Sequence, residues 1–83
     1  MNEEAEIGRL RWRCRRGMKE LDLLLGRWLD RCYAGASAEE RLRFKDLLEQ
    51  PDPLLAGYLI HGTSAAGTPF AGIVGQIRAL LPR

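Results

Sequence analysis

The residues from Arg15 to Asp22 are those whose types and spacing are best suited to polar chemistry. Two cations, Arg15 and Arg16, precede Gly17, and two carboxylates, Glu20 and Asp22, follow it with a methionine between the two groups. Carboxylates early in a helix favour its positive end, so these acids also have a purely structural interpretation, in which they pair with the arginines. Exposed ion pairs contribute only ~0–1 kcal/mol, so stability hardly requires them. These residue types alone do not indicate a particular function.

The two cysteines and the single histidine predict neither a catalytic centre nor a metal site. Cys14 and Cys32 lack the CxxC spacing, and His61 alone leaves too few ligands for zinc. Neither cysteine has an evident activating base, and the chain has no Gly-rich phosphate loop, so we expect no enzyme. Both cysteines fall on predicted apolar faces, which favours buried free thiols, although the spacing does not exclude one disulfide. His61, near a predicted helix end, is interpreted as structural.

A first helix is predicted from about Glu4 to Arg15, because Ile7, Leu10 and Cys14 recur at steps of three and four. The opposite face carries a tryptophan among arginines: Arg9, Trp12, Arg13 and Arg16. Trp12 has two interpretations at this point. It packs against a neighbouring helix with arginine stems covering its edge, or it belongs to a surface that binds a partner, where Trp and Arg are enriched.

Gly17 is predicted to be the hinge between this helix and a second one, since glycine tolerates backbone angles closed to other residues. The second helix, from Met18 to about Tyr33, is the most clearly amphipathic segment of the chain. Its apolar stripe consists of Leu21, Leu24, Leu25, Trp28, Leu29 and Cys32.

Three shorter helices are expected to follow. They run from Ser37 to about Gln50, from Asp52 to Gly62 and from Thr68 to Pro82. Ser37 and Glu40 match a capping box, Asp52 is expected to cap the fourth helix, and Thr68 with Pro69 repeats that kind of start. Because no alternating β pattern occurs, residues 1–83 are predicted to form one all-α domain, a compact bundle of five short helices.

The composition fits a small soluble protein and narrows the classes of function. The chain has 83 residues, of which 46% are hydrophobic, and a net charge of +2. That charge is too small to indicate a nucleic-acid binder by itself. No stretch has the ~20 apolar residues of a membrane span, so no membrane insertion is expected. The acidic start, Met1 to Glu4, lacks the features of a leader, which points to a bacterial cytoplasm.

Two blocks of the chain resemble the family of succinate dehydrogenase assembly factors, small helical proteins that promote covalent attachment of FAD to the flavoprotein subunit. The first block consists of Arg9-Leu10, Trp12 and the run from Arg15 to Asp22. Within it, Arg16, Gly17 and Glu20 match the family's core motif, Arg-Gly-x-x-Glu. The second block consists of Leu47-Leu48-Glu49, Pro51-Asp52-Pro53, Leu54 and Tyr58-Leu59. The likeness covers roughly residues 9–61.

This resemblance implies that the partner is the flavoprotein subunit of succinate dehydrogenase, or that of its fumarate reductase relative. The attachment chemistry would be the partner's own, this chain would bind no FAD tightly, and it would act by favouring one state of the partner. The five amphipathic stretches and the isolated thiols separately predict a monomer. Arg16 and Glu20 would supply directional polar contacts, Met18 an adaptable apolar one, and Gly17 a close approach of backbones. The implied contact residues are Arg9, Trp12, Arg15, Arg16, Gly17, Met18, Glu20 and Asp22.

A small arginine-rich helical protein that binds nucleic acid, or acts as a regulator, is the alternative function. Five arginines between Arg9 and Arg16 could contact phosphates. Glu20, Asp22 and the acidic start oppose this interpretation, and nothing in the chain resembles a known nucleic-acid motif. A patch of mixed charge with Trp12 fits a protein partner better, so no nucleic acid is expected.

Overall fold

The most amphipathic segment of the sequence forms the centre of the structure. In the computed structural model, which describes residues 3–81, helix α2 (Lys19–Arg31) packs against all four other helices. Its apolar stripe is buried as predicted, except that Cys32, just past the helix end, is only half-buried. The other elements are α1 (Glu3–Arg13), α3 (Ala38–Leu48), α4 (Asp52–Leu59) and α5 (Ala71–Arg78). The prediction of an all-α bundle of five helices is confirmed for these residues.

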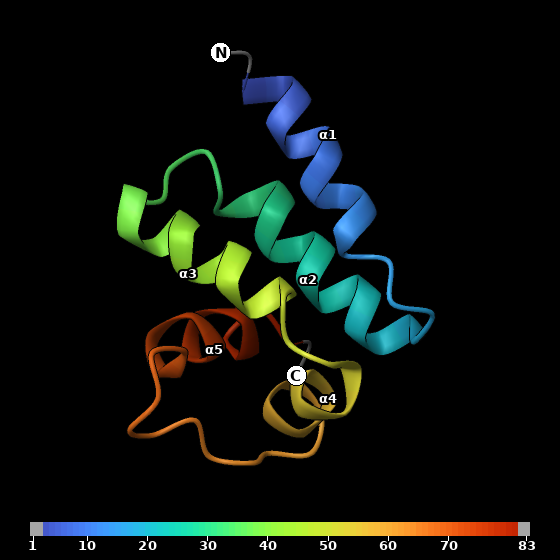
Figure 1. The fold of residues 1–83 in the computed structure, drawn as a ribbon, viewed down its shortest axis with the longest axis vertical. Coiled ribbons are helices and arrows are strands. Elements are labelled where there is room, and N and C mark those ends of the chain that lie inside the picture. Colours follow the sequence, from blue (N-terminus) through green and yellow to red (C-terminus); the bar gives the residue numbers. More distant parts are fainter. Residues whose placement is uncertain (1–2, 82–83) are drawn as a thin grey trace.

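Figure 1 shows how the helices are layered around α2. Helix α1 leads down to the start of α2, α3 lies beside α2, and α4 and α5 pack together below them. The radius of gyration is 11.9 Å, close to the ~11.8 Å expected for a compact chain of this length. No helix within residues 3–81 is long and apolar enough to cross a membrane.

Three aromatic side chains form the middle of the core. The Trp28 ring stacks on Phe44 of α3 with 4.5 Å between centroids, and Tyr33 meets both rings edge-on. The polar ends of two rings reach partners, because Trp28 Nε1 donates to Gln76 and the Tyr33 hydroxyl donates to Glu6 at 2.6 Å. A large aromatic core with satisfied polar ends holds α2 and α3 in one relative orientation.

The start of α3 is as predicted, whereas the start of α4 is not. Ser37 and Glu40 form the expected capping box. Asp52 does not cap α4: it is the first helical residue, Pro51 occupies the cap position, and no side chain caps this end. The Asp52 carboxylate instead accepts a hydrogen bond from Arg16. A charged partner from a distant segment thus replaces the local backbone donor that the sequence suggested.

The last helix is shorter than predicted. Thr68 donates to the carbonyl of Ala65 and accepts from the amide of Phe70, so residues 68–70 form a turn and α5 starts only at Ala71. Leu81, predicted to continue the apolar stripe, is 40% exposed, and the predicted helix end at Pro82 lies outside the described residues. A Cβ at either glycine of α5 would have no neighbour within 4 Å, so close packing does not explain these two glycines.

Candidate functional site

The loop between α1 and α2 depends on the backbone freedom of Gly17. This residue has φ +84°, in the left-handed region that favours glycine. A Cβ built on Gly17 would meet no atom within 4 Å, so the backbone conformation, and not crowding, requires glycine here. Met18 follows in an extended conformation and α2 begins at Lys19. The predicted hinge is confirmed.

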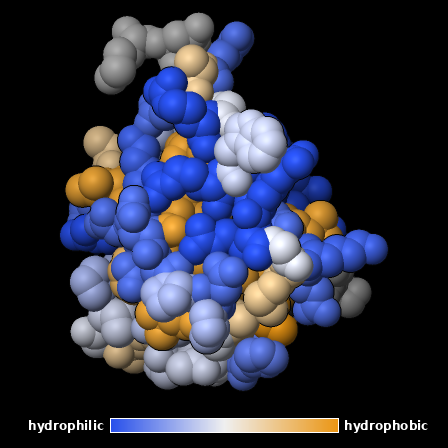
Figure 2. Space-filling model, turned by 45° about the vertical axis from the view of Figure 1, so that its right-hand side comes forward, coloured by the Kyte–Doolittle hydropathy of each residue, from blue (hydrophilic) through white to orange (hydrophobic). Residues whose placement is uncertain are grey.

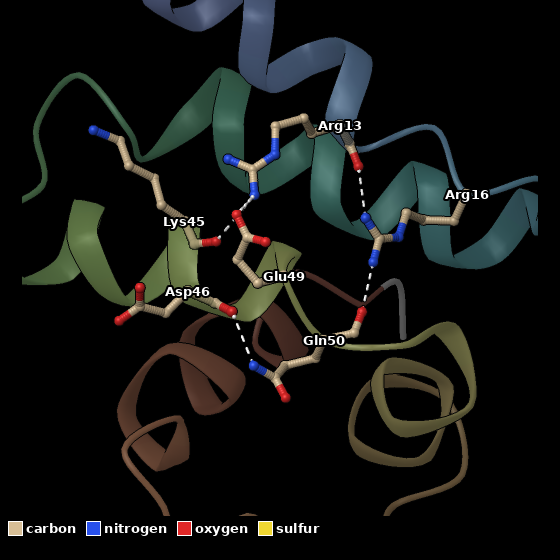
Figure 3. Close-up of polar contacts among 6 residues, drawn as sticks. All are labelled: Arg13, Arg16, Lys45, Asp46, Glu49 and Gln50. Atoms are coloured by element: carbon tan, nitrogen blue, oxygen red, sulfur yellow. Dashed lines mark hydrogen bonds and ion pairs between the residues drawn. The ribbon is translucent and has the colours of Figure 1, made fainter.

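Arg16 is held by contacts with three different segments, of which Figure 3 draws those with Arg13 and Gln50. Its Nη2 donates to the carbonyl of Gln50 at 2.6 Å, its Nη1 to the carbonyl of Arg13 at 3.1 Å, and its Nε to Asp52 Oδ1 at 2.8 Å. Its side chain is only 15% exposed. Since the last carbonyls of a helix lack partners within it, the guanidinium satisfies the end of α1 at Arg13, and it also ties the residue after the C-cap of α3 to the start of α4.

Asp22 completes this arrangement from within α2. Its Oδ1 accepts a hydrogen bond of 2.6 Å from the backbone amide of Arg16. The acid therefore closes the loop around Gly17 by binding main chain, not the arginine side chain that the structural interpretation assigned to it. We refer to Arg13, Arg16, Asp22, Gln50 and Asp52 as the Arg16 network. Two predicted contact residues, Arg16 and Asp22, thus already have partners within the chain.

Other predicted contact residues point outward. Trp12 is 72% exposed and the Arg15 guanidinium lies 5.1 Å from its ring centroid, so the interpretation that Trp12 packs against a neighbouring helix is wrong. Arg9, Met18 and Glu20 are also exposed. Within the described residues, the Glu20 carboxylate has no hydrogen bond or ion pair. Strongly hydrophilic side chains cover much of one face, with pale and orange ones among them (Figure 2). We refer to Arg9, Trp12, Arg15, Met18 and Glu20 as the outward motif residues.

An open groove of about 750 Å³ runs beside Gly17 between α1 and α2. It is lined by Arg11, Cys14, Arg15, Gly17, Lys19, Asp22, Leu23 and Gly26. Burial raises the pKa of the Cys14 thiol to about 11, so this cysteine is protonated at neutral pH. Both cysteines are free, and Cys14 is buried as predicted. One residue of this groove could have been recognised from the sequence. Leu23 is an apolar residue outside the buried stripe of α2, which indicates an exposed apolar side chain.

The arginine-rich segment is less basic than its composition suggests. Arg11 pairs with Asp30, Arg13 with Glu49 and Arg16 with Asp52, at distances of 2.6 to 2.8 Å. Three of the five guanidinium groups between residues 9 and 16 are thus paired with carboxylates of this chain. Such pairing removes charge that would otherwise attract phosphates, which weighs against the alternative of a nucleic-acid binder.

Comparison with known proteins gives one consistent result. A family model described as flavinator of succinate dehydrogenase matches residues 8–81, which includes the last helix. A protein named FAD assembly factor SdhE from Coxiella burnetii is 39% identical over 80 residues, covering 96% of this chain and 98% of its own length. A protein of the same name from Xylella fastidiosa is 41% identical over 80 residues, covering 96% and 82%.

A third relative, FAD assembly factor SdhE from Pseudomonas aeruginosa, is 43% identical over 61 residues, covering 74% of this chain and 73% of its own. No solved structure matches the chain significantly. The family model spans nearly all the described residues, including the Gly17 loop and the Arg16 network. The chain therefore belongs to the family of succinate dehydrogenase flavinators, the FAD assembly factors.

Proposed function

We propose that this chain binds the flavoprotein subunit of succinate dehydrogenase through its outward motif residues and thereby promotes covalent attachment of FAD. The observation that carries the proposal is Glu20, an exposed carboxylate without a partner in the described chain, three residues beyond the left-handed Gly17. An unpaired carboxylate and an exposed tryptophan contribute little to the stability of an isolated domain. They are the kinds of side chain that form contacts across interfaces.

In this proposal the chain acts by differential binding and performs no bond chemistry. A ligand shifts a conformational equilibrium only by binding one state better than the other. The chain would bind the flavin-loaded state of the partner, in which the partner's own residues form the bond to FAD. It would itself hold no FAD tightly. We extend the proposal to the flavoprotein of fumarate reductase, and to a monomeric factor acting in the bacterial cytoplasm.

Within this surface the Arg16 network would have a positioning role. Arg16 and Asp22 fix the loop, so Gly17, Met18 and Glu20 are presented on a rigid support. Preorganised contact residues lose less conformational freedom on binding, which raises affinity without additional contacts. Arg16 would then support recognition mainly by holding its neighbours in place.

The test is covalent flavin fluorescence of the partner subunit in denaturing gels, from cells that lack their own factor and express each variant. Glu20→Ala should weaken binding by about tenfold and lower covalent flavin, while the melting temperature stays unchanged. Glu39→Ala is the matched control, because Glu39 is also an exposed acid at the second position of a helix. It should leave both the flavin signal and the melting temperature as they are.

Gly17 allows a second comparison at equal backbone strain. Gly17→Ala and Gly17→Arg both place a side chain on a left-handed residue, but only arginine adds bulk toward the partner. We expect Gly17→Arg to lose far more covalent flavin than Gly17→Ala at similar melting temperatures. Normal flavinylation by folded Glu20→Ala and Gly17→Arg variants would show that this surface is not where the protein works.

A further inference from the structure

A second groove opens on the other side of α2 from the Arg16 network. It lies between α2, the end of α4 and the last described residue of the chain, and has a volume of about 280 Å³. Its lining is mostly aliphatic: Leu23, Leu24, Leu59, Ile60 and Leu81, with Glu20 and Arg27 as the polar members. We refer to it as the α2–α4 groove. Leu23 is 52% exposed, although it lies in the middle of a helix whose other leucines are buried.

The α2–α4 groove is continuous with the outward motif residues. A neighbouring depression is lined by Met18, Lys19, Glu20, Ile60 and His61, and it shares both Glu20 and Ile60 with the groove. The exposed apolar side chains of Met18 and Leu23 therefore lie on either side of the Glu20 carboxylate along α2. Exposed apolar surface beside a polar rim is typical of a protein interface.

Charge and size restrict what can occupy the groove. Arg27 Nη1 donates to the carbonyl of Leu80 at 3.3 Å, which holds this guanidinium against the end of the described chain, whereas the Glu20 carboxylate has no partner in the described chain. Glu20 is therefore the polar group of the lining that is free to accept hydrogen bonds, and a carboxylate forms its strongest hydrogen bonds with a cation. The volume lies just below the ~300 Å³ at which small-molecule pockets begin, which suits one or two side chains and not FAD.

We propose that the α2–α4 groove binds a short segment of the flavoprotein in which an aliphatic side chain is followed closely by a lysine or arginine. The aliphatic side chain packs between Leu23, Ile60 and Leu81, and the cation pairs with Glu20. This inference rests on the proposed function, because it assigns a second contact area to the same partner. It extends the contact surface from the Gly17 loop to the ends of α4 and of the described chain.

The experiment measures the dissociation constant of the purified flavoprotein subunit of succinate dehydrogenase by titration calorimetry. Leu23→Ser and Leu81→Ser remove exposed aliphatic groups from the groove, and Leu42→Ser is the matched control. Leu42 is a mid-helix leucine of α3 with 51% exposure, almost the same as Leu23, and it does not line the groove. We expect Leu23→Ser to weaken binding by about tenfold, Leu81→Ser by several-fold, and Leu42→Ser to leave it unchanged.

Glu20→Gln tests the cation separately, since it removes charge with little change of shape. Binding by the unchanged chain should weaken with added salt, and the variant should show a flatter salt dependence. If the unchanged chain binds and both groove variants bind equally well, the groove inference is wrong while the proposed function stands. If the unchanged chain does not bind the flavoprotein, both fail. Sedimentation tests whether a second copy of this chain occupies the groove. Self-association of the unchanged chain that is lost in Leu23→Ser would show that it does, and would also overturn the inference.

Discussion

The two ends of one short motif, Arg16 and Glu20, lie only four residues apart and have opposite environments. The Arg16 side chain is mostly buried and hydrogen-bonded to three segments, whereas the Glu20 carboxylate is exposed and has no partner in the described chain. Gly17, between them, turns the backbone so that one end faces the interior and the other faces solvent. A shared motif therefore does not imply a shared role. Here one end supports the fold and the other is available to a partner.

The largest loss of stability is expected for Arg16→Ala, which tests the contrast between Arg16 and Glu20. The substitution leaves the Asp52 carboxylate and the carbonyls of Gln50 and Arg13 without their donor. Charged hydrogen bonds of this kind contribute about 1.5–3 kcal/mol, so we expect a loss of about 2–3 kcal/mol. For a domain of this size the melting temperature should fall by roughly 8–20 °C, as measured by circular dichroism.

Arg15→Ala is the control for that measurement, because Arg15 is the neighbouring arginine, is exposed, and has its guanidinium over the exposed Trp12 ring, with no ion pair to a carboxylate of the described residues. Its free energy of unfolding should change by no more than ~0.5 kcal/mol. Equal melting temperatures for the two variants would contradict the division of roles and place Arg16 with the outward motif residues.

A smaller effect is expected at the turn itself. Gly17→Ala forces a Cβ onto a left-handed residue and should cost about 1–2 kcal/mol, although no atom lies in its way. Gly8→Ala makes the same substitution within α1, where a Cβ also meets open space and φ is not positive. It should instead stabilise the protein by up to ~1 kcal/mol. Urea unfolding measures the change in the free energy of unfolding for both variants, which should have opposite signs. A stabilising Gly17→Ala would show that the hinge is not strained.

The smallest effect is expected from a comparison of two carboxylates. Glu6 supports the fold through its hydrogen bonds, whereas Glu20 does not. Hydrogen bonds from Lys45, and then from Tyr33, hold the pKa of Glu6 below its ordinary value of 4.5. A lowered folded-state pKa means that this contribution to stability is present above pH 4.5 and is lost as the pH falls through the folded-state pKa. Glu6→Gln should therefore flatten the decline of melting temperature as the pH falls below 4.5. At pH 7, Glu20→Gln should leave the melting temperature unchanged, because this exposed carboxylate has no partner in the described chain, and an unchanged pH slope in Glu6→Gln would refute this role of Glu6.

The fold and the family were predictable because they depend on local patterns. The apolar stripe of α2 and the Ser37–Glu40 box are readable from spacing, and the structure contains both. The motif of Arg16, Gly17 and Glu20 predicted an assembly factor and no enzyme, and the family match confirms this. The need for glycine at the hinge was likewise visible, since a helix-breaking residue stood between two helical patterns.

The parts that were not predictable depend on contacts between distant segments. Asp52 looked like a helix cap because local sequence offers it a nearby amide, but Arg16, 36 residues away, provides a charged donor. Nothing in the spacing of Arg15 and Arg16 tells which arginine turns inward. The exposure of Leu23 and Leu81 in one groove also follows only from how α4 and the residues after α5 pack against α2.

Cys14 gives the groove beside Gly17 a chemical property of its own. With a pKa of about 11, only about one thiol in ten thousand is ionised at pH 7, and thiolate is the nucleophilic form that attacks peroxides and disulfides. The groove beside Gly17 is thus lined by a sulfur atom that stays almost entirely in the thiol form at neutral pH, the form that reacts slowly with oxidants.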